Sequence, residues 1–161
     1  MSFQIRVGNG FDVHSHVDDA TRKLVLGGVE FPNARSLAGH SDADVVAHAV
    51  ADALLGAAGM GDIGEHFPDT DPRYKGIDSI KLLAEVAAMV RAGGWSIGNV
   101  DCSLVLEEPK IAPAKADMQR NLSDAVGAPV TVKGRRAEKL GAIGRGEGIA
   151  CFASAVISRE Q

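Results

Sequence analysis

The sequence is poor in cysteine, and its two cysteines, Cys102 and Cys151, lie far apart and form no Cys-x-x-Cys pair. This pattern argues against a disulfide framework and against a zinc site built from thiolates. It is typical of proteins from a reducing compartment, so we expect a cytoplasmic location.

Long apolar runs are missing as well. Residues 1–6 lack the apolar stretch of a secretion signal, and no run approaches the roughly 20 residues that a membrane-crossing helix needs. We therefore expect a soluble protein that is not exported and has no membrane partner. A chain of 161 residues of which 45% are hydrophobic can bury a real core, and we expect one domain over residues 1–161.

Basic residues give no broad excess, because the formal net charge is −4. This balance argues against nonspecific binding of nucleic acid, so we expect no nucleic-acid partner. Positive charge is nevertheless concentrated between Lys133 and Arg145, where five basic residues accompany one acid. Such an island in an acidic chain favours a small anionic ligand such as a phosphate ester, with a solvated loop as the alternative.

Apolar periodicity predicts secondary structure in the order ββααβαββ. The predicted strands are residues 4–13, 23–31, 97–106, 130–133 and 149–157, and the predicted helices are residues 41–56, 80–90 and 114–126. We expect the first two strands to pair as an antiparallel hairpin. The order indicates an α+β fold, an α/β sandwich with a mainly antiparallel sheet and helices on one face.

The first helix carries one polar stripe on an otherwise apolar surface. Ser41, followed three residues later by Asp44, resembles a capping-box start. Asp44, His48 and Asp52 are spaced i, i+4, i+8 and therefore lie one above another on the same face. A buried imidazole beside carboxylates must be paired, protonated or coordinated to a metal.

The first strand offers two more candidate ligands, Asp12 and His14, which alternation places on the same face. Together with His48 they form a ligand set suited to zinc, and three protein ligands leave a fourth position open, as in catalytic zinc sites. Asp44 or Asp52 would then orient His48. The alternative is that the two histidines never meet, since nothing local shows that the strand and the helix converge.

Two loops complete the set of candidates. Residues 62–72 have almost no periodicity, which is typical of a functional loop, although turn chemistry also explains the segment. Residues 134–148 are rich in glycine and arginine, which suits phosphate binding, but they lack the Gly-Lys-Ser/Thr ending of a P-loop. Glu138 would suit a Mg²⁺ ion on a diphosphate, or it forms an ion pair with Lys139 or Arg136.

Several separated motifs span nearly the whole chain. Because these motifs follow one another in the family's order, the sequence resembles the 2-C-methyl-D-erythritol 2,4-cyclodiphosphate synthase family of isoprenoid biosynthesis. The motifs are Gly10–His14, Ala38–Asp44 with His48, Asp52–Gly56, Gly61–Gly64, Phe67–Pro72, Gly98–Asp101, Pro109-Lys110, Glu138–Gly141 and Gly144–Gly148. The resemblance implies that residues 1–161 form a single catalytic domain. It also implies a phosphorus-oxygen lyase that cyclises 4-diphosphocytidyl-2-C-methyl-D-erythritol 2-phosphate and releases CMP.

The same resemblance implies a homotrimer with active sites between subunits and the following roles. Asp12, His14 and His48 would hold one zinc ion per subunit, and Glu138 would help to place Mg²⁺ or Mn²⁺ on the diphosphate. His40 and Arg136 would be catalytic. Substrate contacts would come from Ser41, Asp62, Ile63, Gly64, Phe67, Asp69, Thr70, Asp71, Arg135, Ala142 and Arg145. The cytosine pocket would comprise Leu106, Glu107, Glu108, Pro109, Lys110, Ile111 and Ala112.

The sequence also departs from the family pattern. Arg135-Arg136-Ala137 stands where the family usually has threonines, Ala142 replaces an aromatic residue and Phe152 replaces an acid. Two other hypotheses therefore stay open. One is a zinc-dependent phosphoester hydrolase, in which the open metal site activates water. The other is a non-catalytic trimer that binds a nucleotide or an isoprenoid.

Overall fold

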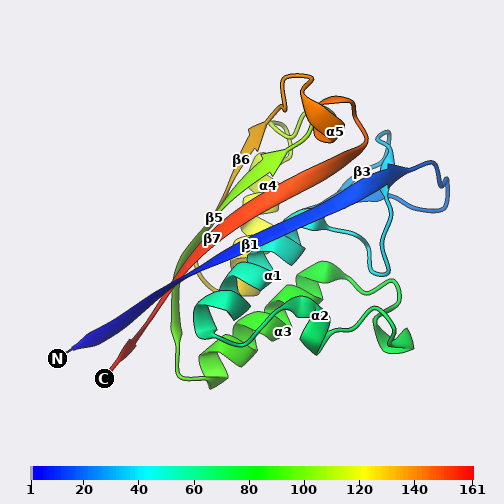
Figure 1. The fold of residues 1–161 in the computed structure, drawn as a ribbon. Coiled ribbons are helices and arrows are strands. Elements are labelled where there is room, and N and C mark those ends of the chain that lie inside the picture. The colour runs from blue at the N-terminus through cyan, green and yellow to red at the C-terminus, as the bar shows by residue number, and fades with distance from the viewer. Residues whose placement is uncertain (1) are drawn as a thin grey trace.

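The computed structural model describes residues 2–161 and has an α+β architecture (Figure 1). Its main sheet has the strand order β4-β1-β7-β5-β6. These strands are β1 (Phe3–Val17), β4 (Ser36–Leu37), β5 (Ser96–Val105), β6 (Val130–Arg135) and β7 (Gly148–Glu160). Within the described residues, β5 and β6 pair in parallel and the other neighbours are antiparallel, which confirms the mainly antiparallel sheet.

The predicted hairpin between the first two strands is wrong. Instead, β1 pairs with β7, from the pair Phe3 and Glu160 to the pair Ser15 and Gly148, and its last residues pair with β4. Residues 23–31 instead form a small separate sheet, in which β2 (Leu24–Leu26) turns into β3 (Val29–Phe31). The intervening glycines, Gly27 and Gly28, have φ of 57° and 72°, so the chain reverses within the segment that periodicity assigns to one strand.

Helix α1 (Val45–Ala58) begins later than predicted, because Asp44 and not Ser41 caps it. The Asp44 carboxylate accepts hydrogen bonds from the backbone N–H groups of residues 46 and 47, and also from Gly27 and Gly28 in the β2–β3 turn. Burial and the neighbouring Asp42 raise the pKa of Asp44 to about 6, against the effect of these donors. Asp44 thus joins the small sheet to the start of α1.

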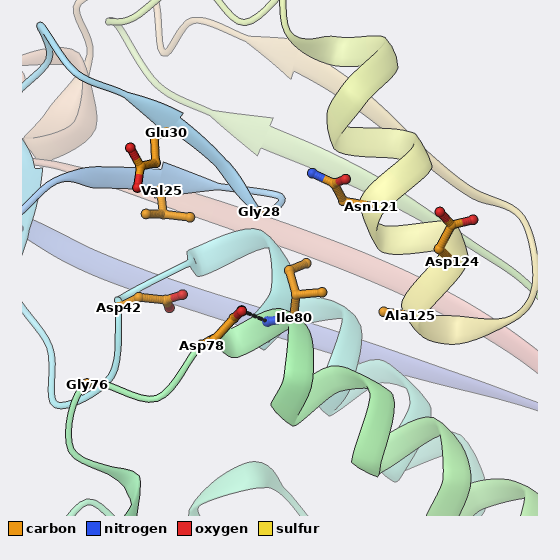
Figure 2. Close-up of a pocket in the computed structure, with 10 residues that line it drawn as sticks. All are labelled: Val25, Gly28, Glu30, Asp42, Gly76, Asp78, Ile80, Asn121, Asp124 and Ala125. Atoms are coloured by element: carbon orange, nitrogen blue, oxygen red, sulfur yellow. Dashed lines mark hydrogen bonds between the residues drawn. The ribbon is translucent and has the colours of Figure 1, made fainter.

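The three longer helices lie on one face of the main sheet, as predicted. Helix α1 packs against β1 and β7, α3 (Ser79–Ala92) packs against α1, and α4 (Lys115–Val126) packs against α3 and β6 (Figure 1). The chain also forms the short helices α2 (Ile63–His66) and α5 (Gly141–Gly144) and the 3₁₀ turn η1 (Pro72–Tyr74). An acidic cavity, drawn in Figure 2, lies among the β2–β3 turn, the start of α3 and α4.

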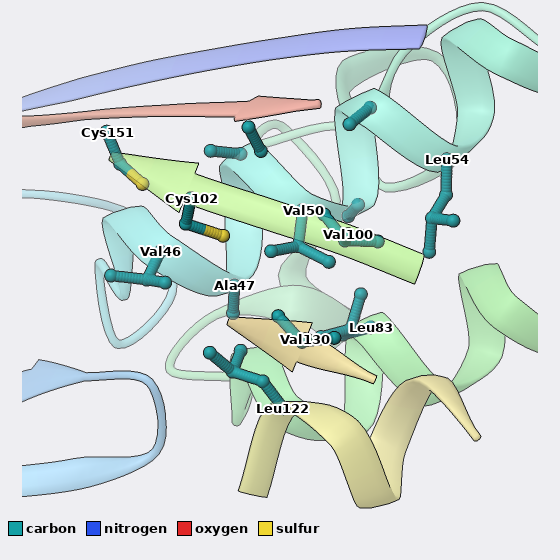
Figure 3. Close-up of a cluster of buried hydrophobic side chains, with 14 of the residues drawn as sticks. Val46, Ala47, Val50, Leu54, Leu83, Val100, Cys102, Leu122, Val130 and Cys151 are labelled. Carbon is teal, nitrogen blue, oxygen red and sulfur yellow. The ribbon is translucent and has the colours of Figure 1, made fainter. Parts of the chain in front are cut away.

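The core lies between these helices and the sheet. Figure 3 shows Val50 of α1, Leu83 of α3 and Leu122 of α4 converging on the inner face of β5 and β6. The free thiols Cys102 and Cys151 are buried in the same core. Within residues 2–161, no helix combines the length and the apolar character that crossing a membrane requires.

Two glycines of β1 allow α1 to lie directly on the sheet. A Cβ atom on Gly10 would lie 1.8 Å from the carbonyl oxygen of Ala49, and one on Gly8 would lie 2.1 Å from that of Ala53. Because both neighbours are helix backbone, neither can move aside cheaply. The missing side chains therefore bring Asp12 and His14, the next polar residues of β1, close to α1.

We expect Gly10→Ala to lower the free energy of unfolding by about 3 kcal/mol, since the added methyl group must push β1 and α1 apart. Gly56→Ala is the control, because Gly56 is exposed in α1 and its Cβ would meet only Asn9 O at 3.7 Å. This second change should stabilise the protein by about 0.5–1 kcal/mol through helix propensity. Denaturant titration at one protein concentration measures both, and equal stability of Gly10→Ala and the parent would contradict the close approach.

On the other face of the main sheet, the described part of β1 exposes a row of large apolar side chains. Val7 is 68% exposed and Ile5 is 66% exposed, and the rings of Phe11 and Phe152 pack in a tilted arrangement with their centroids 4.9 Å apart. We call this surface the apolar sheet face. Its members are Phe3, Ile5, Val7, Phe11, Val13 and Phe152. So many large exposed apolar side chains on one surface are typical of a contact with another protein surface.

Candidate metal centre

Asp12 and His14 of β1 meet His48 of α1, as the sequence predicts. Asp12 Oδ2 lies 2.9 Å from His14 Nε2 and 3.0 Å from His48 Nδ1. The two ring nitrogens are 3.4 Å apart. The interpretation in which the two histidines never meet is therefore wrong. Among residues 2–161, these three are the group of histidine, cysteine and acidic side chains with donor atoms close enough to share one metal ion.

The donor atoms fit a metal ion by distance and by chemistry. Ligands placed about 2.0–2.2 Å from a tetrahedral ion are separated by about 3.3–3.5 Å, which small movements of the three side chains would reach. One carboxylate oxygen and two imidazole nitrogens are ligands that zinc accepts. The set also leaves a coordination position for a further ligand.

Burial and hydrogen bonding give the centre its charge. Burial acts to raise the pKa of Asp12, but hydrogen bonds and charge from His14 and His48 outweigh it and hold the pKa well below its usual range. Burial acts to lower the pKa of His14, yet the hydrogen bond and charge of Asp12 raise it above its usual value. Asp12 is therefore an ionised carboxylate at neutral pH, ready to attract a cation.

The groups that orient the two rings were not predicted. His14 Nδ1 lies 2.6 Å from the backbone oxygen of Ala38, and His48 Nε2 lies 2.8 Å from Ser79 Oγ and 3.1 Å from Ser41 Oγ. Ser79 is 31 residues from His48, and no local sequence signal marks it as a partner.

The two carboxylates that were expected to orient His48, Asp44 and Asp52, accept hydrogen bonds from backbone N–H groups instead, so that prediction is wrong. Asp44 caps α1 and holds the β2–β3 turn. Asp52 accepts a hydrogen bond of 2.8 Å from the backbone N–H of Ile63. It therefore ties the predicted substrate segment, residues 62–64, to the same helix that carries His48.

The predicted substrate loops meet beside this centre. His40 Nε2 lies 3.2 Å from the backbone oxygen of Asp71, so the segment before α1 contacts the end of the loop 67–71. In that loop Phe67 packs edge-on against Tyr74, with ring centroids 5.3 Å apart. Asp69 and Thr70 lie in the chain between Phe67 and Asp71, the residues that make these two contacts.

Two aspartates of these loops have local roles that sequence reasoning left open. Asp62 caps α2 through Glu65 N, while Asp71 caps η1 and pairs with Arg73 at 2.7 Å. These capping hydrogen bonds thus give one reason for an aspartate at each of the two positions. In Asp62 the capping hydrogen bond uses one carboxylate oxygen, because Oδ1 accepts from Glu65 N.

The predicted nucleotide segment forms a second site, a pocket of about 280 Å³ at the end of β5 and β6. Its lining residues are Leu106, Glu107, Pro109, Lys110, Ile111, Ala112, Gly134, Arg135 and Arg136. The structure therefore brings the predicted cytosine-binding residues together with both arginines, while Glu108 stands beside this lining. Glu107 also accepts a hydrogen bond from Ala137 N and so fixes the start of the following loop.

Within one chain this pocket is separated from the metal centre. The sheet register places Val13, beside the ligands, level with Ala150, Val105 and Arg135 on successive strands. Since neighbouring strands lie about 4.8 Å apart, three steps correspond to about 14 Å.

The loop after β6 carries the remaining predicted residues. Glu138 is exposed and has φ of 53°, and Ala142 lies in the short helix α5. Arg145 is exposed and pairs with Glu147 at 2.7 Å. None of these three belongs to the group around Asp12 within the described residues of this chain.

Comparisons with known proteins agree on one family. A model of the YgbB family matches residues 5–158. A 2-C-methyl-D-erythritol 2,4-cyclodiphosphate synthase of Geotalea uraniireducens (strain Rf4) is 51% identical over 159 residues, covering 97% of this chain and 100% of the relative. The synthase of the same name from Cupriavidus pinatubonensis (strain JMP 134 / LMG 1197) is 53% identical over 162 residues, covering 99% and 95%.

Solved structures give the same result for the fold. The bifunctional IspDF from Campylobacter jejuni superposes with a TM-score of 0.92 at 41% identity; the match covers 99% of this chain and 44% of that longer chain. IspF of Plasmodium falciparum in a CDP complex superposes with a TM-score of 0.83 at 33% identity, covering 98% of this chain and 97% of that one.

Proposed function

This chain belongs to the YgbB family, and on that premise we propose that it converts 4-diphosphocytidyl-2-C-methyl-D-erythritol 2-phosphate into 2-C-methyl-D-erythritol 2,4-cyclodiphosphate and CMP. Residues 1–161 act as a single catalytic domain. The observation that carries the proposal is the convergence of Asp12, His14 and His48 in a chain that matches the named synthases along nearly their whole length.

The reaction is an intramolecular phosphoryl transfer, which makes the enzyme a phosphorus-oxygen lyase. An oxygen of the 2-phosphate attacks the β-phosphorus, the bond from that phosphorus to the bridging oxygen breaks, and CMP leaves with that oxygen. Because nucleophile and electrophile belong to one substrate, the protein has to fold the substrate into attack geometry and neutralise its crowded charges.

We assign one zinc ion per subunit to Asp12, His14 and His48, because these residues offer a zinc-compatible ligand set with an open position. Glu138 is the exposed carboxylate that we assign to Mg²⁺ or Mn²⁺ on the diphosphate. When bound, the two metals supply positive charge to the phosphate oxygens. Asp12 contributes an ionised ligand, and the Ala38 carbonyl keeps the Nδ1 edge of His14 turned away from the ion.

The loops beside the centre are assigned to the methylerythritol and phosphate groups. His40 stabilises the charge that develops on the reacting phosphates, and Ser41 contacts a phosphate. The first amides of α1 do not serve this purpose, since Asp44 already accepts the N–H groups of residues 46 and 47. The methylerythritol contacts come from Asp62, Ile63, Gly64, Phe67, Asp69, Thr70 and Asp71.

The pocket at the end of β5 and β6 is assigned to CMP. The segment Leu106–Ala112 receives the cytosine, and Arg135 and Arg136 supply charge to the adjoining phosphates. Ala142 and Arg145 lie on the loop that follows. Arg136 stands in place of a family threonine, and its longer cationic side chain takes over stabilisation of the transition state.

Arg136→Ala should lower kcat by about 100-fold and change the Kd for CMP only a few-fold, because the lost charge acts mainly on the transition state. Arg120→Ala is the control, as Arg120 is an exposed arginine of α4 that pairs with Asp117. Steady-state kinetics and CMP titration measure both quantities. Equal activity of Arg136→Ala and the parent would reject the catalytic assignment.

The active form is a homotrimer with its sites between subunits. The apolar sheet face supports self-association, since its large apolar side chains are exposed within the described residues. The separation of about 14 Å between the ligands and the nucleotide pocket supports a site completed by a neighbouring subunit. The two free, buried thiols are compatible with a cytoplasmic location.

Phosphorus NMR of the purified protein with the 2-phosphate substrate, zinc and Mg²⁺ tests this function. Equimolar CMP and cyclic diphosphate are the expected products. A linear phosphate product would instead identify a hydrolase. Unchanged substrate that remains bound would identify a non-catalytic binding protein.

A further inference from the structure

A hydroxyl group at the start of α3 contacts the Nε2 edge of the His48 ring. Ser79, the first residue of α3, has no exposed surface, and its Oγ lies 2.8 Å from His48 Nε2. The same hydroxyl contacts Asp42 Oδ1. His48 thus lies between Asp12 on its Nδ1 side and the Ser79–Asp42 pair on its Nε2 side.

The Asp42 carboxylate, which accepts from the groups around it, fixes the direction in which the Ser79 hydroxyl donates. The Asp42 carboxylate accepts backbone N–H groups from Asp44 at 3.1 Å and from Ser79 at 3.0 Å. A carboxylate oxygen can only accept, so the Ser79 hydroxyl donates its proton to Asp42. The Ser79 oxygen is then left to accept from His48 Nε2 when that nitrogen carries the proton.

On the other side of the ring, His48 Nδ1 lies 3.0 Å from Asp12 Oδ2, the position from which it can bind a shared metal ion. A ring that binds the ion through Nδ1 carries its proton on Nε2, the nitrogen from which Ser79 accepts, so Ser79 favours the metal-binding tautomer and fixes the ring plane. Ser41 also approaches Nε2, at 3.1 Å, but its oxygen additionally accepts from Ala43 N. Ser79 is nearer and is fully buried, so it keeps its hold on His48 when Ser41 turns to a substrate phosphate.

We propose that Ser79, held by Asp42, is the positioning residue that sets the tautomer and orientation of His48 for metal binding. The inference rests on the metal site assigned above. The start of α3 contributes no metal ligand, but through Ser79 it influences the affinity of the site for zinc. Asp42 acts through Ser79, and neither residue touches the substrate.

The matched variants Ser79→Thr and Ser79→Val test the hydroxyl. Both add bulk at the same buried position, but only threonine keeps the hydroxyl group. We expect the Kd for zinc, measured by chelator competition, to rise about 10–100-fold in Ser79→Val relative to Ser79→Thr. Equal zinc affinity in two folded variants would overturn the proposal.

A measurement on the parent protein keeps the test decisive if a variant does not fold. Nitrogen-15 NMR of the zinc-loaded protein reads which nitrogen of each ring binds the ion and which carries the proton. The expected result is a His48 ring that binds zinc through Nδ1 and keeps its proton on Nε2, and a ring that binds zinc through Nε2 would overturn the proposal. Neither readout requires turnover, so a failure of the proposed cyclisation would leave both results interpretable.

Discussion

Asp12→Asn is expected to lower turnover by about 1000-fold while leaving the fold intact. Asp12 Oδ2 lies within 3.0 Å of ring nitrogens of His14 and His48, and Asp12 is the acidic residue of the three. Asparagine keeps the size of the side chain but removes the negative charge that attracts the ion. Zinc content by mass spectrometry and turnover measured on the same sample should therefore fall together.

Asp18→Asn provides the matched control, because Asp18 follows β1 in an exposed loop and pairs only at the surface with Arg35. Its zinc content and turnover should equal those of the parent. Full turnover of Asp12→Asn with zinc still bound would show that the ion sits elsewhere and would remove the triad from the mechanism.

Val7→Asp is expected to give a monomer that keeps its zinc but loses at least about 100-fold in turnover. Val7 lies in the middle of the apolar sheet face and is 68% exposed in the isolated chain. An unpaired carboxylate buried there by assembly would cost several kcal/mol per contact. The triad lies within one chain and survives, but the nucleotide pocket of the neighbouring subunit is lost.

Sedimentation velocity, zinc analysis and turnover together test this expectation. Ala88→Asp adds the same charge to an exposed position of α3, on the side of the protein away from the apolar sheet face, and should leave a fully active trimer. A Val7→Asp protein that is monomeric and fully active would contradict the assignment of the site to two subunits.

The three candidate ligand residues could be predicted from the sequence because each lies in a regular element. Strand alternation pairs Asp12 with His14, and helical spacing marks His48 as a polar residue on an apolar helix. What periodicity could not show is that the two elements meet. Their contact depends on Gly8 and Gly10, where the absence of a side chain lets α1 approach β1.

Other features depended on contacts between distant residues. The pairing of β1 with β7 joins the two ends of the chain, so a hairpin with the next strand was the wrong choice. Ser41 matched a capping pattern, but the left-handed conformation of Ala43, with φ of 58°, delays the helix until Asp44 can cap it. Ser79 reaches His48 only because α3 packs against α1, which no local pattern encodes.

The measurement that tests the cyclisation most directly is the reaction run in water enriched in oxygen-18, with mass spectrometry of both products. If the 2-phosphate oxygen is the nucleophile at this centre, neither CMP nor the cyclic diphosphate gains the heavy isotope. A heavy oxygen in either product would mean that water attacks phosphorus, and the protein would then be a metal-dependent hydrolase.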